Sequence, residues 1–316
     1  MTILKQRRIH ALTFLACITA VFAGLASPAS AGAETAATVA LGCTWEDTQF
    51  TSLGLLTEVS AARGSGGAFS QREKPQLVAD TEISADDLKS LKPSGGVIEV
   101  YFHVITTTSG RGYVSPATVQ EQIRVLNQTF ASTGFTFVLV DTDYTANNAW
   151  FAQATFEDEV AMKSALREGD HTDLNIYTTS GGGYLGWAYY PKTVHSKYAV
   201  LDGVVLHYGS LPGGYIPNYN LGYTATHEVG HWLGLAHTFE FGCQGHGDFV
   251  KDTPDQAVPT EGCPVYGTQD TCPGEGVDPV NNYMDYSYDI CYTQFTPGQA
   301  ERMQKMWAHW RVKRAA

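Results

Sequence analysis

Eleven residues in the second half of the chain, H-E-V-G-H-W-L-G-L-A-H, constrain its fold more than any other feature. His227 and His231 are four residues apart, so on an α-helix they project from one face and can hold one ion. Gly234 stands where the helix should end, because glycine adopts a left-handed C-cap without steric penalty. The chain can then turn and bring in His237 as a third ligand. Three protein ligands and a water form the catalytic pattern of zinc, whereas structural sites close with a fourth protein ligand.

Glu228 follows the first ligand directly. From that position its carboxylate can reach a water held by the metal without ligating the metal itself. The alternative is a surface helix that carries histidines by chance, and the third histidine and the glycine in register argue against it. The motif therefore predicts a metal-dependent hydrolase with one catalytic Zn²⁺ and Glu228 as general base.

The same motif is the signature of the metzincin metallopeptidases, which also need a methionine-containing turn downstream. N-N-Y-M-D-Y-S-Y-D-I-C places Met284 in such a turn. This segment, the following Q-F-T-P-G-Q-A-E-R-M and the insert D-F-V-K-D-T-P resemble the pappalysin (cytophagalysin) family. The resemblance runs from about Val97 to the C-terminus. It implies a secreted zinc endopeptidase in which Met284 packs beneath the metal and Tyr286 helps to stabilise the transition state.

The expected fold class is α/β (α+β): a metzincin-type catalytic domain with a mixed sheet, an active-site helix and a Met-turn, split by a cleft at the zinc. Apolar runs predict strands, and capping signals predict a helix that starts after Ser115 and another that starts after Thr296. The predicted strands span residues 97–105, 135–140, 174–178 and 203–208.

The N-terminus has the features of a secretory signal, with a basic start, an apolar stretch and Ala29-Ser30-Ala31 as a cleavage pattern. Residues 60–96 are rich in Gly, Ser, Pro and charge, as linkers are. We expect a signal peptide over 1–31, a propeptide and linker over 32–95, and the catalytic domain over 96–316. The protein should then be extracellular, a monomer, and not bound to a membrane once the signal is removed.

The formal net charge is −12, and residues 1–31 contribute only basic groups to it. Such an acidic surface argues against nucleic acid as a partner and suits calcium or cationic peptide segments. The expected partners are protein or peptide substrates.

Four cysteines flank the predicted metal helix and the Met-turn, and an exported protein would join them as two disulfides. The sequence by itself permits three connectivities. The family resemblance favours Cys243–Cys272 and Cys263–Cys291.

Cys43 stands apart from these four. A thiolate is a good fourth zinc ligand, so Cys43 could hold the enzyme latent as a switch in the propeptide. The alternative is an unused thiol or an intermolecular disulfide.

Asp248, Asp252, Thr253 and Asp255 form an oxygen-rich cluster that suits Ca²⁺, and the resemblance supports a structural calcium there. The expected ligands are Asp248, Asp252 and Thr253. The alternative is a polar surface loop. Asn127-Gln128-Thr129 is a glycosylation sequon.

Substrate is expected to lie extended along an edge strand near residues 203–208. Just before Cys291, Asp289 would favour Arg or Lys after the scissile bond, whereas Ile290 would favour an apolar residue; the sequence leaves both open. Two rival functions remain: hydrolysis of a non-peptide amide at the same zinc site, or a binding module without turnover.

Overall fold

The computed structural model describes residues 58–60 and 90–312, apart from residues 245 and 275. The predicted signal peptide, Cys43 and most of the predicted propeptide lie outside the described residues. All described residues belong to one compact unit, Asp47–Ala316. Within those ranges no helix is long and apolar enough to span a membrane.

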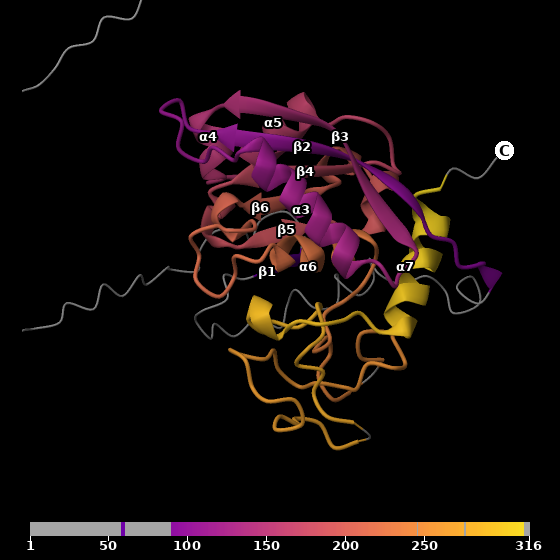
Figure 1. The fold of residues 1–316 in the computed structure, drawn as a ribbon. Helices are drawn as coiled ribbons and strands as arrows, with labels where there is room; N and C mark the ends of the chain where they lie inside the picture. The colour runs from indigo at the N-terminus through magenta and orange to yellow at the C-terminus, as the bar shows by residue number, and fades with distance from the viewer. Residues whose placement is uncertain (1–57, 61–89, 245, 275, 313–316) are drawn as a thin grey trace, which may run out of the picture. The chain divides into compact units, whose positions relative to one another are not determined.

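The centre of this unit is a six-stranded mixed sheet in the order β1-β5-β6-β4-β2-β3 (Figure 1). Strands β2, β3, β4 and β6 run parallel, β5 is antiparallel to β6, and β1 is antiparallel to β5. Their bounds are β1 Glu58–Ser60, β2 Gly96–Thr106, β3 Phe135–Ala146, β4 Leu174–Thr179, β5 Gly186–Ala188 and β6 Val204–His207.

The helices cover both faces of the sheet. Helices α3 (Pro116–Thr129) and α6 (Tyr223–Trp232) contribute Val119, Leu126 and Val229 to the main core, against β2 and β4. Helices α4 (Asn148–Ala152) and α5 (Phe156–Leu166) line a second core with Phe151 and Met162. The predicted α/β class with a mixed sheet is confirmed.

Capping groups define where the long helices begin. The Ser115 side chain accepts from the amide of Thr118, ahead of a proline at the first position of α3. Thr296 and Gln299 form the predicted capping box of α7 (Pro297–Trp310). The 3₁₀ turns are η1 Gly181–Gly183, η2 Pro191–His195, η3 Ala199–Leu201, η4 Tyr208–Ser210 and η5 Asp289–Cys291.

The predicted strand over residues 203–208 is present as β6, but its expected place at the edge of the sheet is wrong. Strand β6 lies between β4 and β5 and is paired on both sides. Strand β5 follows three glycines and has only three residues, too few for a periodic pattern. Among the strands from residue 96 onward, β5 therefore forms the edge at this side of the sheet.

Candidate metal centre

Helix α6 carries the first two predicted ligands on one face, and both side chains are buried. The helix stops two residues before Gly234, whose φ of 99° is left-handed. The amide of Gly234 donates to the carbonyl of His231 (2.8 Å), and the amide of Leu235 donates to Gly230 (2.9 Å). These bonds close the helix end in the manner of a glycine C-cap. The chain turns here and returns His237 toward the helix.

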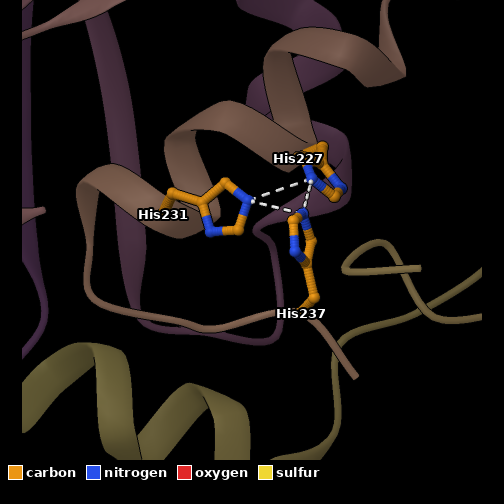
Figure 2. A group of neighbouring side chains, drawn as sticks. All are labelled: His227, His231 and His237. Atoms are coloured by element: carbon orange, nitrogen blue, oxygen red, sulfur yellow. Dashed lines mark hydrogen bonds between the residues drawn. The ribbon is translucent and has the colours of Figure 1, made fainter. Parts of the chain in front are cut away.

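The three imidazole rings meet through their Nε2 atoms (Figure 2). The Nε2 separations are 3.0 Å for His227–His231, 3.1 Å for His227–His237 and 3.2 Å for His231–His237. Zinc bound tetrahedrally at about 2.0–2.1 Å would separate two such nitrogens by roughly 3.3 Å. The triangle therefore has nearly the dimensions that one tetrahedral ion requires. Among the described residues this is the one group of three His, Cys, Asp or Glu side chains that converges in this way.

Two backbone carbonyls fix the tautomers of the two helix histidines. His227 Nδ1 lies 2.7 Å from the carbonyl oxygen of Tyr283, and His231 Nδ1 lies 2.7 Å from that of Leu235. A carbonyl only accepts, so each Nδ1 carries the proton and each Nε2 presents a lone pair. Lone pairs at about 3 Å repel one another unless a cation lies among them. The donor set thus fits Zn²⁺, and the carbonyls act as the outer shell that orients metal-binding histidines.

Glu228 lies on the same helix and is buried. Its side chain lies beside strand β5, because a Cβ added at Gly186 would be 3.0 Å from Glu228 Cγ. The predicted base is therefore enclosed between α6 and strand β5.

Met284 is fully buried beneath α6. Its amide donates to Asn282 Oδ1 at 2.9 Å, and its own carbonyl accepts from Thr238 at 3.3 Å. This turn also supplies the Tyr283 carbonyl that orients His227. The predicted Met-turn thus supports α6 by packing and by one hydrogen bond to His227.

The ring of Tyr286 lies at the metal centre. Its centroid is 4.8 Å from the ring of His237 and 5.7 Å from that of His227. Phe239 packs against both Tyr286 and His237, at 4.9 and 4.5 Å. These contacts place the phenol ring beside two of the three converging histidines, His227 and His237.

The long segment between α6 and α7 is held by two disulfides, Cys243–Cys272 and Cys263–Cys291. This is the pairing that the family resemblance implies. The second bridge ties the segment to η5, next to Asp289.

Of the three predicted calcium ligands, the structure brings Asp248 and Thr253 together and places Asp252 apart from them. Thr253 Oγ1 lies 2.7 Å from both carboxylate oxygens of Asp248, and burial raises the pKa of Asp248 to about 7 against the opposing hydrogen bond from Thr253. Asp252 is turned away: it accepts from Thr296 Oγ1 (2.7 Å) and the amide of Gly298 (2.9 Å) at the start of α7. Calcium binding stays a prediction.

A family model described as pregnancy-associated plasma protein-A matches residues 173–308. An extracellular metalloprotease of Pyricularia oryzae is 47% identical over 240 residues, which is 74% of this chain and 83% of the relative. One from Sordaria macrospora is 42% identical over 281 residues, covering 82% of this chain and 97% of the relative.

Solved structures show the same likeness. A promirolysin mutant of Tannerella forsythia has a TM-score of 0.63 and 30% identity, covering 76% of this chain and 91% of that one. Mature mirolysin in complex with a cleaved peptide has a TM-score of 0.57 and 30% identity, covering 70% and 98%.

Proposed function

This chain belongs to the pappalysin-type family of metalloproteases, and from that premise we propose that it is a secreted zinc endopeptidase with Glu228 as its general base. The observation that carries the proposal is the convergence of three Nε2 lone pairs, one helical position from a buried carboxylate. The name of the solved mirolysin complex, which holds a cleaved peptide, supports peptides as the substrate class.

A zinc ion bound by the three histidines would supply a Lewis acid that acidifies water and polarises the scissile carbonyl. Glu228 accepts a proton from the attacking water and delivers it to the leaving amine. Tyr286 donates a hydrogen bond to the carbonyl oxygen as negative charge develops there. Burial of Glu228 and Tyr286 keeps competing water from both groups.

Strand β5 is the proposed docking edge for substrate. It is antiparallel to β6, and Gly186 brings it against Glu228. An extended peptide paired with the outer edge of β5 would add a strand to the sheet and lie beside the general base.

Strand β1 supports the proposal that residues 32–95 form a propeptide. Glu58–Ser60 pairs antiparallel with the same edge of β5, with Ser60 opposite Gly186. A propeptide in that position would block the docking edge until it is cleaved, whether or not Cys43 also binds the zinc. Secreted active enzyme should therefore begin after Ser60 on N-terminal sequencing. If Cys43 is the switch, unprocessed Cys43→Ser protein should lose a thiolate from its zinc coordination and be less latent than wild type; unchanged zinc coordination with latency equal to wild type would exclude that role.

Burial favours Asp289 over Ile290 as the residue that selects the substrate side chain after the scissile bond. The Asp289 side chain is fully buried and accepts from the amide of Leu221 (2.9 Å), near the start of α6, whereas Ile290 is 78% exposed. We therefore propose that Arg or Lys follows the cleaved bond. Cleavage-site mapping with a peptide library tests this, and a preference for apolar residues there would contradict it.

The calcium proposal rests on Asp248 and Thr253, whose oxygens are already adjacent. After treatment with EGTA, added Ca²⁺ should raise the Tm of the wild type and not of Asp248→Asn. Asp270→Asn is the control, because Asp270 is exposed in the same segment. An equal response of all three proteins would place calcium elsewhere.

The main test is casein cleavage by the processed protein with and without 1,10-phenanthroline. Cleavage should stop with the chelator, and Glu228→Ala should keep its zinc while losing about 10²–10⁴ in rate. Zinc binding without any cleavage of casein or peptides would favour the non-peptide amide hydrolase or the binding module instead.

A further inference from the structure

Strand β5 and the residue that follows it carry two aromatic side chains, Trp187 and Tyr189, whose polar atoms both donate to one carboxylate on α5. Trp187 lies on the face opposite to α6, in the second core, and Tyr189 follows two residues later on the same face. Trp187 Nε1 donates to Glu159 Oε1 at 2.9 Å, and the Tyr189 hydroxyl donates to Glu159 Oε2 at 3.1 Å. A single carboxylate on α5 thus holds the strand at two points.

Glu159 is itself fixed by a buried ion pair. Lys163 Nζ lies 2.7 Å from Glu159 Oε1 and donates to the carbonyl of Leu201 at 2.7 Å. The same ammonium lies 4.6 Å from the centroid of the Tyr189 ring. Both charged side chains are buried, Lys163 completely.

A buried ion pair is weak evidence for stability, since desolvation offsets most of its attraction. The Glu159–Lys163 pair has a more specific effect on geometry, because it holds the Glu159 carboxylate in place. Two anchors on alternate residues fix both the position of β5 along its own axis and its rotation about that axis. On its inner side β5 has only three register pairs with β6.

The opposite face of β5 leaves little room for displacement. A Cβ at Gly186 would lie 3.0 Å from Glu228 Cγ and 3.1 Å from Thr224 Cγ2. A shift of this strand by a fraction of an ångström would therefore change the distance between a paired peptide and the base. Reaction rates are sensitive to displacements of this size.

We propose that Glu159 is a positioning residue: through Trp187 and Tyr189 it sets the register and tilt of β5, and so aligns an extended peptide with Glu228. The inference rests on the proposed function, in which substrate pairs with β5. It goes beyond that function by assigning a catalytic consequence to a carboxylate on the far side of the sheet.

The test is Glu159→Gln in the processed enzyme, assayed with peptides of the same scissile sequence and increasing length. The amide keeps one acceptor and loses the charge, so one anchor is lost. For octapeptides kcat/KM should fall about tenfold, mainly through KM, whereas a tripeptide reporter too short to pair along β5 should lose less than about twofold. Zinc content should not change. Glu157→Gln, the same change at an exposed position of α5, should behave as wild type.

Tyr189→Phe keeps the ring packing and removes one donor, and Trp187→Phe keeps a smaller aromatic ring and removes the other donor. Both variants serve if Glu159→Gln fails to fold. Each should give a smaller loss that again grows with peptide length, about threefold for octapeptides. Tyr198→Phe, a tyrosine packed against the same cluster, is the control. Equal losses for long and short peptides, or no loss for either, would overturn the positioning role. A wild type that cleaves no peptide at all would instead refute the proposed function.

Discussion

The sulfur of Met284 lies directly against Gly230, which stands between the two helix ligands of the metal site. A Cβ added at Gly230 would be 2.5 Å from Met284 Sδ and 3.3 Å from its Cε. Met284 is fully buried, so it cannot move aside into solvent. The absence of a side chain at Gly230 therefore lets the Met-turn approach α6 closely.

Gly230→Ala should destabilise the protein despite the better helix propensity of alanine. That propensity is worth about 1 kcal/mol, whereas overpacking a filled core costs about 1–3 kcal/mol. We expect a lower urea midpoint and weaker zinc retention. In a Met284→Ala background the penalty should shrink, and Gly274→Ala, with no atom within 4 Å of the added Cβ, is the control. A stabilised Gly230→Ala protein would show that the turn yields easily.

Tyr286→Phe should lower kcat and leave the zinc content intact. The ring packing against His237 and Phe239 is kept, and only the hydroxyl is lost. Loss of one donor to the developing oxyanion should cost about 10²–10³ in kcat with little change in KM. Tyr266→Phe, an exposed tyrosine in the same segment, should have no effect. Unchanged kcat in Tyr286→Phe would remove Tyr286 from the mechanism.

His207→Asn should make the stability of the folded protein less dependent on pH below about 6.5. Burial and the nearby charge of Arg111 lower the pKa of His207 to about 4, from an ordinary value of 6.5. Folding thus favours neutral His207, and its contribution to stability is present above pH 6.5 and is lost as the pH falls toward 4. Asparagine has no such titration and can still accept from the amide of Gly209, as His207 Nδ1 does at 2.9 Å. Urea midpoints measured from pH 4 to 8 should converge at low pH; parallel curves would contradict the assignment.

Asn127 should carry no glycan in the folded protein, although it begins a sequon. Its Nδ2 donates to the carbonyls of Ile123 (3.1 Å) and Phe137 (2.8 Å), and its Oδ1 accepts from the amide of Phe137 (2.8 Å). A glycan would break this bridge between α3 and β3. Mass spectrometry of active protein secreted from a glycosylating host should find Asn127 unmodified. Full occupancy in active protein would disprove the expectation.

Local features of the sequence were enough to predict the ligands, the main strands and the caps. His227 and His231 depend on helical spacing, and the turn at Gly234 depends on a left-handed φ that glycine adopts freely. Ser115 and Thr296 bind amides only three residues away. Such features can be predicted from the sequence because the interacting groups are close together along the chain.

The sequence of α5 shows no helical repeat of apolar residues, and the reason is physical. Its buried face includes Glu159 and Lys163, so charged residues stand where an amphipathic helix would show apolar ones. Strand β5 was missed because its three residues are defined by their neighbours in the sheet rather than by their own sequence.

The sequence by itself was enough to predict the metal, its three ligands and the base, since one short helix and one turn carry all the predicted residues. The tertiary structure alone decided how that site is supported. It placed β6 inside the sheet and made β5 the outermost strand at that side among the strands from residue 96 onward. It also set the tautomer of His227 through Tyr283 and turned Asp252 toward α7. Strand order and hydrogen bonds between segments many residues apart depend on how the whole chain packs, and no local pattern encodes them.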